Sequence, residues 1–399
     1  MNLNGTNLEH ASAFNRRLVL EAVRSRGPIS RAELARLTGL SAQTVSNIAE
    51  ELAALGLLAA ERRRSAARGQ PPVDLAINPR GGYTIGLHIG RAGLVAVLVD
   101  LAGTVCRQRR SALPRLTIEA LVPRLAAAVG ALIAAERGVR GRVLGVGVAM
   151  PGPFDVAAAR PDAPAAAFAR DEFCSRLAAA IGLPVLIEND ATAAALGERL
   201  YGVGRSLRQF FFVYLGSGVG GGIIIDGVPY KGAAGNAGEF GHIVVEQGGR
   251  PCTCGRRGCL ERYYSLDAAR AALGSADPAV LDARLAAGDK ALARWLDGAA
   301  ARLGEAIATV ENLLDPETVL LGGEASADLL DAVVERLADL PPSVAARPGR
   351  DRARVLRATA GPAAGALGAA ALPIFDMLRP SFRPMLAAPF AERLRAAAG

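Results

Sequence analysis

Hydrophobic residues near the amino terminus recur every three to four positions, which is the period of an amphipathic α-helix. A first helix of this kind runs from Phe14 to about Arg26, and Pro28 prevents it from continuing. A second helix follows residue 30, and a third runs from Ser41 to about Leu55. The three-residue connection between the last two helices has the length found in a helix-turn-helix unit. The pattern therefore predicts three packed helices at this end of the chain.

The third predicted helix has one apolar face and one polar face. Val45, Ile48 and Leu52 share the apolar face, which we expect to be buried. The small and polar residues near its beginning would be exposed: Ser41, Ala42, Gln43, Thr44, Ser46 and Asn47. Such side chains suit contacts with base edges in the major groove of DNA. This segment is thus expected to be a recognition helix.

A strand, a basic turn and a second strand follow between Leu57 and Ile77. The arginines of this segment are Arg62, Arg63, Arg64 and Arg68. Guanidinium groups on such a hairpin would contact DNA phosphates, which strengthens binding without reading the sequence. We therefore expect residues 10–77 to form a winged helix-turn-helix domain. The alternative is a helical interaction module with a solvated basic loop.

Hydrophobic runs of strand length alternate with helical segments along the rest of the chain. Strand-like runs at residues 83–89 and 94–99 precede a helical stretch near 117–137, and a similar succession begins near Phe210. Such alternation is typical of an α/β protein with two lobes around a cleft. We expect a linker at residues 78–82, a first lobe at 83–200 that a helix at 376–397 completes, and a second lobe at 201–375.

Composition and charge exclude some classes of protein. The 399 residues are 51% hydrophobic and 21% charged, so the chain can bury a large core and is not disordered. No run of uncharged apolar residues is long enough to span a bilayer, and no apolar signal segment is present, which favours the cytoplasm. The net charge of +8 comes almost wholly from arginine, since lysine occurs only at 231 and 290. Charge alone therefore says little about a polyanionic partner.

Four metal-binding side chains gather in one glycine-rich segment, which also carries Glu239 and Glu261. They are His242, Cys252, Cys254 and Cys259. Three thiolates and one imidazole make a complete tetrahedral zinc set and leave no open position, which favours a structural ion. Reduced core cysteines or a disulfide are the alternatives, but apolar packing does not require this spacing and a reducing compartment disfavours disulfides.

Two further segments have the composition of ligand-binding loops. A short apolar run ends in Asn189 and Asp190, which could hold sugar hydroxyls; Asp190 could also act as a general base toward one of them. The same residues could instead cap the helix that follows. The glycine-rich stretch at residues 215–222 permits a close approach of phosphate to the backbone, but it equally suits a tight hairpin.

Taken together, these motifs resemble the ROK family, which comprises bacterial sugar kinases and sugar-responsive repressors. The resemblance covers essentially the whole chain. Its most specific segments are PGPFD (151–155), ENDA (188–191), LGSGVGGG (215–222), GEFGH (238–242) and CTCGRRGCLE (252–261). The winged helix followed by INP (77–79) resembles the repressor branch.

The resemblance implies an α/β fold of the actin-like (ribonuclease H-like) type behind the winged helix-turn-helix. It also implies zinc at His242 and the three cysteines. By the same resemblance a sugar would face Asn189, Asp190, Glu239, His242 and Glu261.

The chain departs from the kinases of this family at the first phosphate loop. Where they carry Asp-x-Gly-Gly-Thr, this chain reads His88-Ile89-Gly90-Arg91-Ala92. Loss of the acid removes a ligand for magnesium and triphosphate. Glu324 stands where the family usually has a small residue near adenosine. ATP and magnesium are therefore not expected as cofactors.

These observations predict a repressor that binds operator DNA and whose degenerate kinase domain senses a sugar or sugar phosphate through the linker at 78–82. The loop at 155–174 lacks the family's sugar-loop pattern, so the identity of the sugar is not carried over. The alternative is an active ATP-dependent kinase of a hexose or amino sugar, with Asp190 as its base. A zinc hydrolase is disfavoured because protein ligands fill all four zinc positions. Paired half-sites in operators suggest a homodimer or homotetramer.

Overall fold

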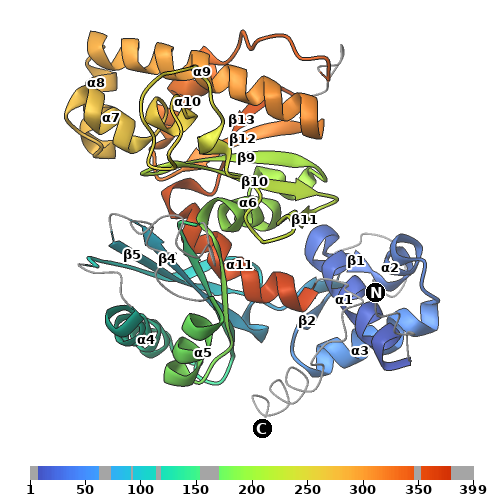
Figure 1. The fold of residues 1–399 in the computed structure, drawn as a ribbon. Coiled ribbons are helices and arrows are strands. Elements are labelled where there is room, and N and C mark those ends of the chain that lie inside the picture. The colour runs from blue at the N-terminus through green and yellow to red at the C-terminus, as the bar shows by residue number, and fades with distance from the viewer. Residues whose placement is uncertain are drawn as a thin grey trace.

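The computed structural model of the 399-residue chain describes residues 8–62, 73–90, 93–113, 118–152, 170–345 and 352–378. In these residues a small domain precedes two α/β lobes (Figure 1). Some expectations lie outside them: those for Arg63, Arg64, Arg68, Arg91 and Ala92, for the side chain of Arg62, and for most of 155–174 and 376–397. Within the described part of the chain, no helix is both long and apolar enough to cross a membrane.

The amino-terminal domain has the winged helix-turn-helix arrangement that the sequence predicts. Its elements are α1 (Leu8–Arg26), β1 (Ile29–Ser30), α2 (Arg31–Thr38), α3 (Ala42–Ala54), β2 (Leu58–Arg62) and β3 (Val73–Ile77). The strands pair antiparallel in the order β1-β3-β2. Local interactions set the helix ends: Ser30 and Glu33 form a capping box at the start of α2, and Gly39 ends it with a φ of 70°.

The first lobe is built on a five-stranded sheet. Its strands are β4 (Tyr83–Gly90), β5 (Gly93–Asp100), β6 (Val105–Ser111), β7 (Val143–Met150) and β8 (Val185–Asn189). The order is β6-β5-β4-β7-β8, in which β4, β7 and β8 run parallel and β5 and β6 pair antiparallel. Helices α4 (Ile118–Ala135) and α5 (Arg170–Ile181) pack together beside this sheet, and Leu125 and Phe173 join its core.

The second lobe repeats this layout. Its strands are β9 (Phe210–Leu215), β10 (Val219–Ile225), β11 (Val228–Pro229), β12 (Thr318–Gly323) and β13 (Val355–Arg357), in the order β11-β10-β9-β12-β13. Again three strands are parallel and two are added antiparallel. The helices of this lobe are α7 (Leu266–Leu273), α8 (Pro278–Ala286), α9 (Lys290–Leu314) and α10 (Ala327–Arg336), which build one core with the sheet.

Two helices lie between the sheets: α6 (Asp190–Tyr201) and α11 (Ala364–Leu378) (Figure 1). α11 packs against α6 and against β4 and β7 of the first lobe. Gly86 and Gly147 make this approach possible, because a Cβ at either residue would lie 1.9 Å from a carbonyl oxygen of α11. The chain therefore returns to the first lobe at Ala364, within the range 201–375 expected for the second lobe and before the helix expected at 376–397.

Candidate ligand-binding cleft and metal centre

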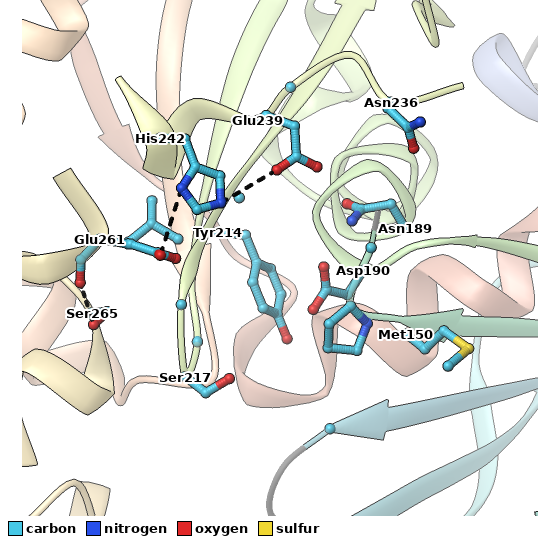
Figure 2. Close-up of a pocket in the computed structure, with 18 of the residues that line it drawn as sticks. Met150, Asn189, Asp190, Tyr214, Ser217, Asn236, Glu239, His242, Glu261 and Ser265 are labelled. Carbon is cyan, nitrogen blue, oxygen red and sulfur yellow. Dashed lines mark hydrogen bonds and ion pairs between the residues drawn. The ribbon is translucent and has the colours of Figure 1, made fainter. Parts of the chain in front are cut away.

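A cavity of about 460 Å³ lies between the two lobes (Figure 2). The first lobe contributes the ends of β7 and β8 and the start of α6, and the second contributes the β9–β10 turn and the segment 235–239. All the residues expected to face a ligand line this one cavity: Asn189, Asp190, Glu239, His242 and Glu261. Segments that are distant in sequence thus bring three carboxyl groups, an amide and an imidazole to one place.

Asn189 caps α6 and also lines the cavity. Its Oδ1 accepts hydrogen bonds from the backbone N–H groups of Ala191 at 2.9 Å and Thr192 at 3.3 Å. The helix-cap alternative is therefore correct for Asn189, whose amide nitrogen is not used by the cap. Asp190 is the first helical residue, and its carboxyl group points toward Tyr214 in the cavity (Figure 2).

The carboxyl group of Asp190 is hard to ionise. Burial and the nearby Glu324 carboxylate raise its pKa from 3.8 to about 7, and a hydrogen bond from the Ala191 N–H opposes the rise only partly. Near neutral pH this group is present in both its protonated and ionised forms. It can therefore donate or accept a hydrogen bond toward a polyol hydroxyl.

The four predicted metal ligands converge. The ligand atoms of His242, Cys252, Cys254 and Cys259 all lie within 4.8 Å of one another, so they could hold a metal ion. The fold of this segment depends on Gly258, which has a φ of 82°. A Cβ there would lie 1.7 Å from the carbonyl oxygen of Glu246, so no other residue fits.

The imidazole of His242 connects this cluster with the cavity. Its Nδ1 lies 3.5 Å from the Cys252 sulfur and 3.6 Å from Glu261 Oε1. Its Nε2 is 3.7 Å from Glu239 Oε2 (Figure 2). One ring nitrogen thus faces the thiols while the other faces the cavity beside Glu239, so the cysteine cluster and the cavity share one side chain.

A second group of polar side chains lies next to Asp190, and two of them, His88 and Glu324, also line a neighbouring cavity of about 670 Å³. His88 of β4 places its Nε2 3.4 Å from the hydroxyl of Tyr214 on β9 and 4.0 Å from a carboxyl oxygen of Glu324, which follows β12. Burial lowers the pKa of His88 to about 4, so the ring is neutral at neutral pH and does not form an ion pair with Glu324. Sequence reasoning singled out His88 and Glu324 separately, but it did not find Tyr214 or predict that the three meet.

The expected DNA-contacting residues at the start of α3 are largely accessible. Ala42, Gln43 and Asn47 are exposed, whereas Thr44 and Ser46 are half-buried. The hydroxyl of Ser41 accepts a hydrogen bond from the Thr44 N–H at 3.1 Å, so Ser41 caps the helix. Gln43 donates to Asn47 at 2.8 Å, which aligns two amide side chains on one exposed face. This face can present hydrogen-bonding groups to a partner.

Comparison with known proteins identifies both parts of the chain. The ROK family profile matches residues 84–374, and the MarR family profile matches residues 14–69. The xylose repressor of Bacillus subtilis (strain 168) is 30% identical over 255 residues, which are 63% of this chain and 65% of the repressor.

Two solved structures have a similar fold. A ROK family transcriptional regulator, a homologue of the E. coli MLC protein, superimposes with a TM-score of 0.74 at 24% identity and covers 98% of this chain and 100% of that one. A ROK family glucokinase from Streptomyces griseus, in complex with glucose and AMPPNP, gives a TM-score of 0.62 at 32% identity over 73% of this chain and 99% of its own. The chain described here belongs to the ROK family.

Proposed function

We propose that this protein is a transcriptional repressor whose affinity for operator DNA changes when a sugar or sugar phosphate binds between the lobes. The observation that carries the proposal is the presence, in one chain, of a winged helix-turn-helix domain and a polar cleft of the ROK type. The similarity to a xylose repressor supports the same combination. Operator binding would use Gln43, Asn47 and their neighbours on α3, with the arginines at 62–68 on phosphates.

The chemistry of the cavity suits a sugar. Its volume falls within the range of about 300–1,000 Å³ common for small-molecule sites. A carboxylate accepts hydrogen bonds on both of its oxygens, and an amide donates from its NH2 group and accepts on its oxygen, so each can bind two vicinal hydroxyl groups. We propose Asn189, Asp190, Glu239, His242 and Glu261 as the sugar-binding residues.

The metal centre fits zinc. In a tetrahedral site, zinc lies about 2.3 Å from sulfur and about 2.0–2.1 Å from nitrogen. Two ligand atoms of the same site therefore lie roughly 3.4–3.8 Å from each other. The Cys254 and Cys259 sulfur atoms lie 3.6 Å apart, and the Cys252 sulfur lies 3.5 Å from His242 Nδ1. A bound zinc ion would stabilise this segment. The protein itself would then hold His242 with Nε2 directed toward the cleft.

The cleft does not suit ATP and magnesium. His88 stands in place of the acid that would help to hold magnesium, and the carboxylate of the nearby Glu324 would repel a triphosphate. A sugar kinase remains the second candidate on one observation: the pKa of Asp190 near 7 is suited to a general base.

The proposed function is tested by calorimetry and DNA binding on the same protein. D-Xylose, D-glucose and their phosphates are titrated into the protein, and fluorescence anisotropy then follows a duplex selected from a random pool by the sugar-free protein. We expect one sugar class to bind and to change DNA affinity by about 5- to 150-fold. If no sugar or sugar phosphate of this panel changed the affinity for DNA, the proposal would be contradicted. Size measurement on the DNA complex would report whether the repressor binds as a dimer or a tetramer.

A further inference from the structure

The DNA-binding domain is packed onto the sensor and is not merely tethered to it. Leu101 of the first lobe and Ile374 of α11 belong to the same buried apolar cluster as Val23 and Leu57 of the winged helix, and Tyr201 packs against this cluster. The linker itself is fixed, because the amide nitrogen of Asn78 donates to a carbonyl of the DNA-binding domain at 2.7 Å. Signals can therefore cross a continuous interface rather than only the chain at 78–82.

One helix reaches from the effector cavity to this interface. α6 begins beside Asn189 and Asp190, which line the cavity, and ends at Tyr201, which contacts the core of the DNA-binding domain. Its 12 residues span about 18 Å at 1.5 Å per residue. The helix thus has one end in each of the two regions that regulation must connect.

The carboxyl end of α6 is held by charged groups of α1. The guanidinium of Arg24 donates to the carbonyl oxygen of Leu200 at 3.3 Å and pairs with Glu21 at 2.7 Å. Glu21 also lies 3.9 Å from the guanidinium of Arg199 on α6. Arg24 is only 8% exposed, so its charge is held in a partly dry interface. A cation at the end of a helix, where carbonyl groups lack helical partners, is favourable.

The packing of α6 leaves little room for it to deform. Every residue from Ala191 to Glu198 is buried. On one side the helix touches α11 backbone to backbone, since a Cβ at Gly368 would lie 1.8 Å from the Ala193 carbonyl oxygen. On another it meets β10, where a Cβ at Gly222 would lie 2.6 Å from the Ala191 carbonyl oxygen. At these two contacts backbone meets backbone, so no side chain lies between the elements to absorb a displacement.

We infer that α6 carries the effector signal to the DNA-binding domain and that Arg24 and Glu21 of α1 receive it. This inference rests on the proposed function, because it requires a sugar at Asn189 and Asp190. A sugar bound there shifts the start of α6, and the rigid helix transfers the shift to Leu200 and Arg199.

The charged groups of α1 follow the end of α6. α1 packs directly against α3, so a change in the position of α1 changes the position of α3. Arg16 of α1 also pairs with Glu51 of α3 at 2.6 Å, but both side chains are exposed, so we expect this pair to add little to the packing. α6 and α1 therefore shift together between two positions. The sugar favours one of these positions and the DNA favours the other.

Two substitutions at the interface test the inference. Arg24→Met removes the donor to Leu200 and the ion pair but keeps an apolar stem, while Glu21→Gln weakens only the charge pairs. Arg16→Met is the matched control, since it makes the same chemical change on α1 but breaks a pair that lies wholly within the DNA-binding domain. Melting temperatures identify any variant that fails to fold.

Three quantities are measured for each protein: the Kd for D-xylose or D-glucose without DNA, the Kd for the selected duplex without sugar, and the ratio of duplex affinities with and without sugar. We expect the Kd for sugar of Arg24→Met and Glu21→Gln to lie within about twofold of the wild-type value. The ratio of duplex affinities with and without sugar should fall from about 5- to 150-fold in the wild type toward one in these variants. Arg16→Met should keep the wild-type ratio, and Arg24→Lys should restore part of it by retaining a donor.

The possible outcomes separate the two proposals. A wild-type ratio that survives in both Arg24→Met and Glu21→Gln would overturn the inference and leave the proposed function standing. A wild-type protein that ignores every sugar of the panel would overturn the proposed function, and the inference with it. If Arg16→Met also lost the sugar-dependent change in DNA affinity, the inference would be overturned, because any disturbance of α1 would then have the same effect.

Discussion

The ammonium group of Lys231 forms an ion pair with the buried carboxylate of Glu188 across the two lobes. Glu188 is the residue before Asn189 on β8, and its side chain is 2% exposed. Lys231 begins the segment that carries Asn236 and Glu239 to the cavity, and its carbonyl accepts from the Ala237 N–H at 3.0 Å. The pair thus fixes the two sides of the proposed sugar site relative to each other.

Lys231→Met should weaken sugar binding by about tenfold, because the segment carrying Asn236 and Glu239 loses its anchor. It should also lower the free energy of unfolding by about 1–2 kcal/mol, a value reduced for the half-exposed lysine. The matched control is Lys290→Met, which removes the chain's other lysine at the exposed start of α9. Calorimetric titration measures the Kd for sugar. If both variants had the wild-type Kd, the ion pair of Lys231 with Glu188 would not position the sugar site.

Cys254→Ala should lose the metal ion and most of the stability of the second lobe. Structural zinc contributes on the order of 10 kcal/mol, and the remaining three ligands cannot complete a tetrahedron. Elemental analysis and thermal melting check this. Cys106→Ala is the control, since Cys106 lies on β6 away from the cluster. Metal-free Cys254→Ala with an unchanged melting temperature would contradict a structural role for the ion.

Local features of the sequence predicted the parts of the fold that depend on neighbouring residues. The capping box of Ser30 and Glu33 fixed the start of α2. The spacing of His242 and the three cysteines predicted a cluster whose ligand atoms do converge. In both cases the interacting groups lie close together in the chain, so spacing alone describes their geometry.

Relationships between distant segments could not be predicted in this way. The beginning of α11 is an alanine- and glycine-rich stretch without a clear apolar face, and its place depends on Gly86 and Gly147 in strands far away in sequence. The ion pair of Lys231 with Glu188 likewise joins two lobes. The rarity of lysine was the only feature of the sequence that could have drawn attention to it.

Two buried groups should make stability depend on pH in opposite directions. Asp190 has a folded-state pKa of about 7 against 3.8, so the folded state binds its proton more tightly and stability falls as pH rises from 4 to 7. His88 has a pKa of about 4 against 6.5, so the unfolded state binds more protons and stability rises as pH rises from 4 to 6.5. Each effect is on the order of a few kcal/mol, and in the wild type they largely cancel.

Single substitutions should separate these effects. The melting temperature of Asp190→Asn should rise between pH 4 and 6.5, because His88 alone remains, whereas that of His88→Gln should fall between pH 4 and 7. Asp339→Asn, which changes an exposed carboxylate, is the control and should follow the wild type. Parallel curves for all four proteins would show that neither buried group is shifted. The titratable groups near Asp190 are Glu324 and Glu239, and those near His88 are Tyr214 and Glu324.

Phosphotransfer from ATP should not occur in the wild-type protein. The acid expected in a phosphate loop is replaced by His88, a neutral buried ring, and Glu324 places a carboxyl group near the same position. A coupled assay with magnesium, ATP and D-glucose or D-xylose should therefore give no more ADP than the sugar-free reaction. Sugar-dependent ADP production that Asp190→Ala abolishes would establish the kinase instead.

The variant Glu324→Ala tests whether His88 or Glu324 prevents the use of ATP. Removing this carboxylate takes away a repulsion that raises the pKa of Asp190, so the loss of stability from Asp190 should end at a lower pH. The melting temperature of the variant should therefore rise more between pH 4 and 7 than that of the wild type. We still expect no phosphotransfer, because His88 cannot hold magnesium as the missing acid would. If the variant gained activity, Glu324 alone would account for the loss of kinase function. If Glu324→Ala and wild type had the same pH dependence, the two carboxyl groups would not interact.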